Sequence, residues 1–250
     1  MSGRKSIIGL VATIASLLVA GPASAAFPNL TGCPREAVNF FVCINVQNTT
    51  GNLNIKGFNV PLGASLEIRG GLREDAGQFN FVPARGTNGF ISQPVAVPGG
   101  LLGIEWIPGT SVLAITELAG APEDIVFHFE EFGLTVPVKV RLENLLLGMN
   151  CHIGTDSSPV VLNLITGTTS PPAPNRPISG RVGTFGSITP ELLTLTGNVN
   201  VDNAFAVPGA SRCGLGLGLI NTLVNAKLRL PSAAGNNSIE VTNNIAIGRL

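Results

Sequence analysis

The chain has 250 residues, and its 15 basic and 15 acidic side chains give a formal net charge of zero. Charged residues form 12% of the sequence, about half of the usual ~25%, and the basic residues after position 25 are never adjacent. This pattern argues against nucleic acid as a partner, because phosphate binding requires clustered Lys and Arg. The hydrophobic content of 44% argues against a disordered chain.

Residues 1–25 have the organisation of a cleaved export signal. Two basic residues near the start are followed by an apolar run at 7–20 and by small residues at 23–25, which is the order found in secretory signal peptides. A membrane-spanning helix needs roughly 20 apolar residues, and this run is shorter. We therefore expect cleavage after Ala25.

Removal of 1–25 leaves a β-rich secreted domain at 26–250, with 13 basic and 15 acidic residues and a net charge of −2. A weakly charged surface has little self-repulsion, so it could pack against cell wall, envelope lipid or copies of itself. We expect the mature chain to be extracellular or associated with the cell envelope, and the sequence identifies no specific partner.

Four cysteines, Cys33, Cys43, Cys151 and Cys213, occur in the chain. An even number of cysteines in an exported protein indicates disulfide bonds. Three pairings are open, and we favour Cys33 with Cys43 and Cys151 with Cys213. Each bond would stabilise the fold by about 3 to 5 kcal/mol in the chain-entropy treatment. A zinc site would require close pairs such as C-x2-C, which are absent from the sequence.

Alternation of apolar and polar residues predicts strands along most of the chain. The clearest strand is Val136–Glu143, where apolar residues alternate with charged ones, so that one face meets a core and the other meets water. Similar segments lie at 53–55, 66–68, 79–81, 125–129, 160–164, 193–195, 199–201 and 239–241. Short strands of about five residues separated by turn signals predict an antiparallel β-sandwich or a barrel-like domain.

The segment 217–229 departs from this pattern. Its apolar residues recur at helical spacing, and Pro231 follows as a stop signal, so we predict one helix. A membrane-active amphipathic helix would carry many Lys and Arg residues on its polar face. This segment offers only Lys227 and Arg229, and we therefore favour a helix packed on the core.

The segment 166–180 contains four prolines between positions 171 and 177 and is expected to be extended. We interpret it as a structured surface loop, because the cysteines expected to pair lie on either side of it. A linker that divides the chain near 170, or a division near 135, stays open. A proline-rich segment can also serve as a ligand for a partner groove.

The order of Cys151-His-Ile-Gly154, the proline-rich 166–180 segment, Cys213 and the 230–237 segment resembles an uncharacterised family of secreted proteins from high-GC Gram-positive bacteria. The resemblance covers about residues 136–250. It implies an exported, envelope-associated protein, and it supplies no catalytic residue.

Catalytic histidine motifs are missing from the sequence. The two histidines, His128 and His152, lie outside H-E-x-x-H spacing. We interpret His128 as a solvated strand residue. His152 follows Cys151, which cannot act as a nucleophile if it forms a disulfide bond.

Other catalytic patterns are also weak. No G-x-S-x-G motif occurs, and the glycines at 214–218 lack the spacing of a phosphate loop. The pairs Glu123-Asp124 and Glu130-Glu131 could be offered as glycosidase acids, but those lie on facing elements some ~5 to 9 Å apart. We interpret both pairs as surface charges, and we assign no catalytic, cofactor-binding or metal-binding residue and expect no cofactor.

The leading hypothesis is an exported, disulfide-stabilised, non-enzymatic β protein with a structural or binding role at the cell surface or envelope. One alternative is a secreted hydrolase whose carboxylates are brought together only by the fold. A second alternative is a lipid-binding or membrane-inserting protein.

Overall fold

A computed structural model describes residues 27–100, 103, 109–128, 130–214 and 218–249, so the predicted signal at 1–25 lies outside the described residues. The elements are β1 (Phe40–Ile55), β2 (Phe58–Pro61), β3 (Leu66–Asp75), β4 (Gln78–Pro83), β5 (Phe90–Ser92), β6 (Val95–Ala96), β7 (Leu113–Leu118), β8 (Glu123–His128), β9 (Glu131–Glu143), β10 (His152–Ile153), β11 (Val160–Ile165), β12 (Thr184–Thr189), β13 (Leu192–Asp202), β14 (Ala210–Ser211), α1 (Leu219–Leu228) and β15 (Asn237–Gly248).

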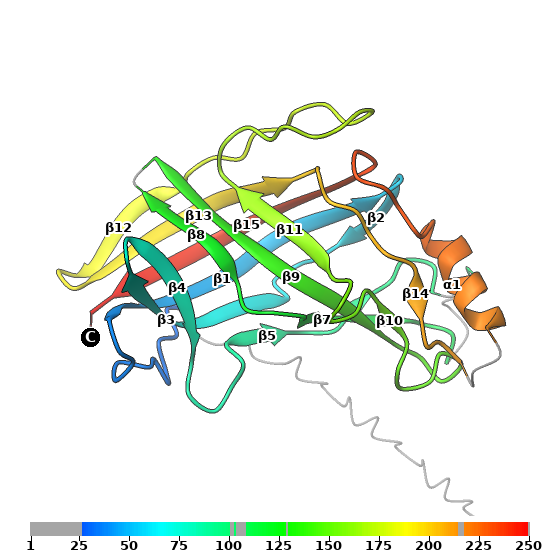
Figure 1. Ribbon diagram of the computed structural model, residues 1–250, viewed down its shortest axis with the longest axis horizontal. Helices are drawn as coiled ribbons and strands as arrows, with labels where there is room; N and C mark the ends of the chain where they lie inside the picture. Colours follow the sequence, from blue (N-terminus) through cyan, green and yellow to red (C-terminus); the bar gives the residue numbers. More distant parts are fainter. Residues whose placement is uncertain (1–26, 101–102, 104–108, 129, 215–217, 250) are drawn as a thin grey trace, which may run out of the picture.

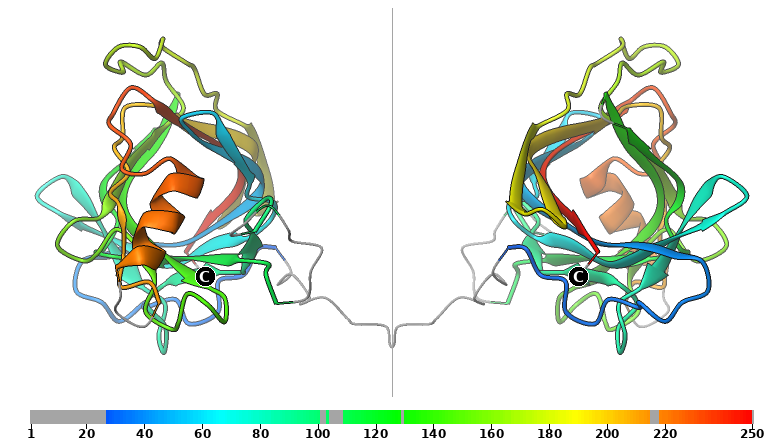
Figure 2. Two further views of the ribbon diagram at one scale, coloured as in Figure 1. Left: turned by 90° about the vertical axis from the view of Figure 1, so that its right-hand side faces the viewer. Right: turned by 90° about the vertical axis from the view of Figure 1, so that its left-hand side faces the viewer.

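All fifteen strands of the described ranges belong to one antiparallel sheet, whose main path is β14-β10-β9-β11-β13-β15-β1-β3-β4. The sheet curls into a barrel-like ring, and α1 lies at one end of it (Figures 1 and 2). The mainly β, antiparallel fold class predicted from the sequence is therefore confirmed. The single predicted helix is also confirmed, over Leu219–Leu228; residue 217 falls outside the described part of the chain.

The two sides of the ring meet where β5, paired with β3, approaches β7, paired with β9. The backbone N–H of Thr116 on β7 donates a hydrogen bond to the Ser92 hydroxyl oxygen on β5, over 3.0 Å. Within the described ranges no backbone ladder joins these two strands. The barrel-like sheet is therefore not closed by continuous hydrogen bonding.

The predicted strand length of about five residues is wrong for the longest strands. β1 has 16 residues, β9 has 13, β13 has 11 and β15 has 12. The segments 193–195 and 199–201 belong to the single strand β13, whose register shifts between Leu195 and Asn198. Gly197 takes a positive φ of 70° there, so a local bulge interrupts the apolar alternation without ending the strand.

The core fills the inside of the curled sheet. Phe132 and Leu72 are 1% exposed and Leu142 is 2% exposed, and burial of such a side chain stabilises a fold by about 1.5 to 3 kcal/mol. Gly70 on β3 allows close packing, because a Cβ atom there would lie 2.2 Å from the Val82 carbonyl oxygen and 2.9 Å from the Phe81 ring.

Two disulfide bonds fasten the chain to this sheet. Cys33 is bonded to Cys43 at the start of β1, and Cys151 beside β10 is bonded to Cys213 just after β14, which is the pairing that the sequence favours. Such bonds persist in oxidising compartments, so they indicate a protein that works outside the cytoplasm.

The proline-rich segment 166–180 is an anchored excursion between β11 and β12. The Asn175 amide donates to the carbonyl oxygens of Asn203 and Asn237, over 2.8 and 2.7 Å. The N–H of Thr169 donates to the Ile178 carbonyl oxygen over 2.9 Å, which draws the two arms of the excursion together.

Among the described residues, no helix is both long and apolar enough to cross a membrane.

Candidate functional site

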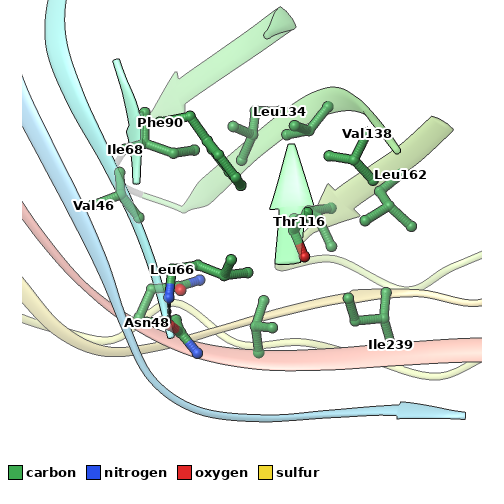
Figure 3. Close-up of a pocket in the computed structure, with 14 residues that line it drawn as sticks. Val46, Asn48, Leu66, Ile68, Phe90, Thr116, Leu134, Val138, Leu162 and Ile239 are labelled. Atoms are coloured by element: carbon green, nitrogen blue, oxygen red, sulfur yellow. Dashed lines mark hydrogen bonds between the residues drawn. The ribbon is translucent and has the colours of Figure 1, made fainter. Parts of the chain in front are cut away.

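Two adjacent cavities lie inside the curled sheet, with volumes of about 100 and 70 Å³. They share five wall residues, which come from β3, β7, β9, β11 and β15 on several sides of the ring: Leu66, Thr116, Val138, Leu162 and Ile239. Figure 3 shows the smaller cavity with its apolar side chains directed inward. Neither cavity has a charged residue among the described residues of its wall.

The alternation of strand β9 explains this interior. Val136 and Val138 are 3% and 4% exposed and line the cavities, whereas Lys139 and Arg141 point outward into an ion-pair cluster. Successive strand residues point to opposite faces. The same sequence pattern that predicts the strand therefore builds an apolar inner wall and a charged outer wall.

Helix α1 closes the end of the larger cavity. Leu228 of α1 lines this cavity together with Phe58 and Phe205. Two helix asparagines accept hydrogen bonds from the β14 segment: Asn225 from the N–H of Ala210 over 2.7 Å, and Asn221 from the N–H of Cys213 over 2.8 Å. The Cys151–Cys213 bond fastens this segment to the chain beside β10. Helix α1 is therefore held at the end of the cavity by two side-chain amides and, through the β14 segment, by a disulfide bond.

A row of buried asparagines crosses the inner wall. Asn48 on β1 lies opposite Asn243 on β15, which lies opposite Asn198 on β13. Their exposed fractions are 5%, 7% and 0%, and the registers of β1 with β15 and of β13 with β15 both shift next to this row. Asn48 and Asn243 line the smaller cavity, so this level of the interior carries polar groups within an otherwise apolar wall.

The hydrogen bonds of the row fix how each amide is oriented. Asn200 donates its Nδ2 to the carbonyl oxygen of Phe132 over 3.0 Å, so its Oδ1 must face the other way. That Oδ1 accepts from Asn198 Nδ2 over 2.6 Å and from Asn243 Nδ2 over 3.0 Å. Asn243 therefore keeps its Oδ1 free of hydrogen bonds within the described part of the chain.

Asn48 has a structural task in the same wall. Its Oδ1 accepts from the N–H of Leu66 over 2.6 Å, and its Nδ2 donates to the carbonyl oxygen of Gly63. Both atoms of the amide thus join β1 to the connection that leads into β3.

Asp202, near the end of β13, is a buried carboxylate that is 3% exposed. Its oxygens accept from the N–H groups of Asn163 and Ala204, each over 2.8 Å. Desolvation by burial raises the pKa of Asp202 above its ordinary value near 3.8, although these hydrogen bonds oppose the shift.

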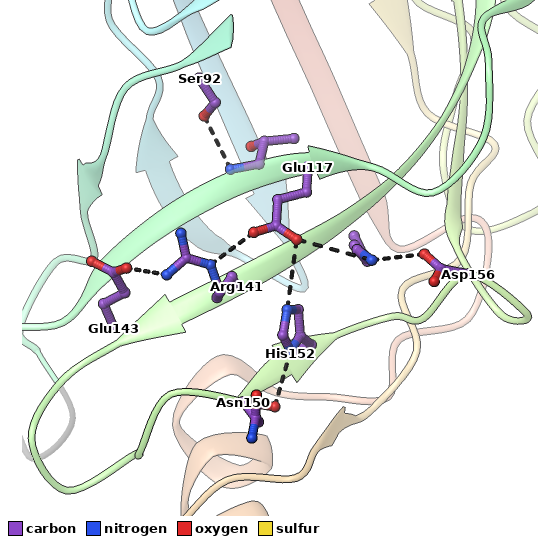
Figure 4. Close-up of polar contacts among 9 residues, drawn as sticks. Ser92, Glu117, Arg141, Glu143, Asn150, His152 and Asp156 are labelled. Atoms are coloured by element: carbon purple, nitrogen blue, oxygen red, sulfur yellow. Dashed lines mark hydrogen bonds and ion pairs between the residues drawn. The ribbon is translucent and has the colours of Figure 1, made fainter. Parts of the chain in front are cut away.

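A cluster of charges on the outside of β7, β9 and β10 contains His152 (Figure 4). Glu117 accepts from Arg141 Nε over 2.7 Å, and Lys139 lies 2.7 Å from Asp156. The hydrogen bond from Lys139 lowers the pKa of Asp156, and the hydrogen bond to Glu117 raises the pKa of Arg141.

This cluster lacks the geometry of a hydrolase site. His152 Nε2 lies 3.7 Å from Glu117 Oε2, which is too long for a hydrogen bond, and its Nδ1 lies 2.9 Å from the Asn150 carbonyl oxygen. The hydroxyl oxygen of Ser92, on the neighbouring strand, accepts from the backbone of Thr116 instead. Cys151 is in a disulfide bond and cannot act as a nucleophile. The cluster is therefore a surface network of ion pairs.

The structure places the other residues considered from the sequence away from the cavities. Glu123 and Asp124 begin β8, whereas Glu130 lies in the turn before β9 and Glu131 begins β9, and all four side chains are exposed. His128 ends β8, and its side chain lies outside the description. The described residues contain no group of His, Cys, Asp or Glu that could hold a metal ion.

The polar residues of the cavity walls, Asn48, Thr116 and Asn243, could not be identified from local sequence motifs. A signal for Asn243 existed, because Ile239, Val241 and Ile245 flank it with a period of two, which predicts that Asn243 points inward with them.

The fold and site together define a curled antiparallel sheet that contains two cavities, with mainly apolar and no charged residues in their described walls, and a helix at one end. Such an interior can enclose an apolar molecule, since an engineered apolar cavity of about 150 Å³ binds benzene. No protein family, curated protein or solved structure matches this chain, so the ligand proposed below is argued from the geometry alone.

Proposed function

We propose that this chain is an exported, non-enzymatic binding protein of the cell surface or envelope, and that it holds a small apolar molecule or a single lipid chain inside its curled sheet. The observation that carries the proposal is the pair of adjacent cavities, with volumes of about 100 and 70 Å³ and described wall residues that are all apolar or uncharged. Apolar clefts with few polar groups are the usual form of small-molecule sites.

Export is supported by the signal-like residues 1–25 and by the two disulfide bonds. An envelope location is supported by the resemblance of 136–250 to secreted proteins of high-GC Gram-positive bacteria. Apolar ligands are abundant near a cell envelope and poorly soluble in water, so an enclosing protein would keep them dispersed.

The proposal is tested with the oxidised mature chain and the neutral apolar dye N-phenyl-1-naphthylamine, whose fluorescence rises in apolar surroundings. We expect saturable binding at one site, and a melting temperature that increases with dye concentration, because a ligand that binds only the folded state stabilises it by about 2.7 kcal/mol at a hundred times its Kd. Dye fluorescence that rises without saturation, together with an unchanged melting temperature, would refute an interior site.

A further inference from the structure

The walls of the two cavities limit which apolar molecules they can accept. We propose that the ligand is an uncharged amphiphile that carries a hydroxyl group, such as a fatty alcohol, and that Asn243 and Thr116 hold this hydroxyl. This inference rests on the proposed function and names its ligand class.

The first step is the absence of a counter-charge. The described walls of both cavities contain no Lys, Arg or His. Transfer of an ionised carboxylate into an apolar interior without a cation is strongly unfavourable. An ionised fatty acid therefore fits these walls poorly, whereas a neutral head group does not meet this obstacle.

The second step is the orientation of Asn243. The carbonyl oxygen of Phe132 fixes Asn200, and Asn200 in turn fixes Asn243, which donates its Nδ2 over 3.0 Å. The Oδ1 of Asn243 is therefore an acceptor without a partner in the described chain, in a side chain that is 7% exposed and lines the smaller cavity. A hydrogen-bond donor on the ligand would satisfy this acceptor, so the matching ligand group is one that donates a hydrogen bond. A hydroxyl donates, whereas an ester or a ketone offers only acceptors.

The third step is Thr116, the one polar residue that lines both cavities. Its backbone N–H donates to the Ser92 hydroxyl oxygen, but its own hydroxyl makes no hydrogen bond in the described structure. A threonine hydroxyl can both donate and accept. It can therefore donate to the ligand hydroxyl while that hydroxyl donates to Asn243.

The nearest rival for a head-group site is Lys227 of α1. It lines a separate space of about 10 Å³ together with Leu142 and Leu228, and both of these leucines also line the larger cavity. The Lys227 Nζ lies 5.7 Å from the centre of the Phe58 ring. An anionic head group would have to sit there, at the α1 end, rather than at the asparagine row.

The experiment is displacement of N-phenyl-1-naphthylamine from the oxidised mature chain by 1-octanol, methyl octanoate and octanoate at pH 8. We expect octanol to displace the dye at a concentration at least tenfold below that of octanoate, with methyl octanoate between them. These compounds also differ in solubility. The decisive quantity is therefore the ratio of the affinity for octanol to the affinity for methyl octanoate, and how this ratio changes in variants.

Thr116→Val, which is nearly isosteric, and Asn243→Leu should each lower that ratio by about two- to tenfold, the range for one hydrogen bond. Thr242→Val is the matched control, because Thr242 is next to Asn243 on β15 and lies outside both cavities; we expect its ratio to stay at the native value. Unchanged ratios in both cavity variants would overturn the inference, as would octanoate binding that equals octanol binding and disappears in Lys227→Met. Failure of every compound and of the dye would instead refute the proposed function.

Discussion

Filling the larger cavity from within should abolish ligand binding while the fold survives. Ala114 on β7 lines this cavity and lies opposite Leu142 on β9. In Ala114→Leu the added isopropyl portion would enter a space of about 100 Å³. The change therefore replaces the ligand's volume with a covalently attached side chain.

The magnitude follows from the carbon atoms exchanged. Ala114→Leu adds three carbons, each worth about 0.8 kcal/mol when buried, and it excludes a similar part of any ligand. We expect a loss of about 2 kcal/mol in binding free energy, which is a roughly thirtyfold increase in Kd. The unfolding free energy should change little, because burial of about 2 kcal/mol is offset by an overpacking cost of about 1 to 3 kcal/mol.

Dye titration and urea unfolding of the same samples measure both quantities. Ala96→Leu is the matched control, because Ala96 makes the same exchange on the neighbouring strand β6 but is exposed and lies outside both cavities; its Kd should equal that of the native chain. If Ala114→Leu folds and binds the dye with native affinity, the binding site is elsewhere and the reasoning from the cavities is wrong.

Three further predictions concern stability. Replacing Cys151 and Cys213 together by serine should lower the free energy of unfolding by about 4 kcal/mol, the loop-entropy value for a closed loop of this length, and a native urea midpoint would contradict it. Gly70→Ala should destabilise the chain by about 2 kcal/mol or more, or prevent folding, as expected for strong overpacking, because its Cβ would lie 2.2 Å from a carbonyl oxygen. Gly167→Ala is the control, because its Cβ would have its nearest neighbour 4.0 Å away, and it should change the urea midpoint little. The raised pKa of Asp202 means that the folded state binds this proton more tightly than the unfolded state. The contribution of Asp202 to stability is therefore largest below about pH 4 and is lost as the pH rises through the folded pKa. An NMR titration that places the folded pKa below 3.8 would reverse the sign of this pH dependence.

The fold class could be predicted because the strongest strands alternate cleanly. In β9 the charged residues Lys139, Arg141 and Glu143 separate the inward valines and leucine, so both the strand and its faces follow from a period of two. Strand length was harder to predict. The middle of β1 and the middle of β13 contain Asn, Thr and Gly at positions where alternation predicts apolar residues, and these positions resemble turns in the sequence.

The same bulges explain why the candidate site escaped prediction. A register shift in β1 between Asn48 and Thr50 changes which later residues face inward, and the shift in β13 before Asn198 does the same. The row of Asn48, Asn243 and Asn198 exists only because three strands far apart in the sequence are paired in that register. Nothing local to any one asparagine shows that its neighbours across the sheet are also asparagines.

An apolar interior that was only a folding core would not need this row for its stability. Replacement of buried hydrogen-bonded groups by apolar groups of similar shape is often nearly neutral for stability, so stability alone does not require Asn198, Asn200 and Asn243. Their hydrogen bonds leave the amide oxygen of Asn243 without a donor among the described residues, and Asn243 lines the smaller cavity. If the row serves only to fix the register of β13 against β15, Asn243→Leu will lower the urea midpoint and leave the ratio of octanol to ester affinity unchanged. If the row serves recognition, the ratio will fall even in samples whose stability is native.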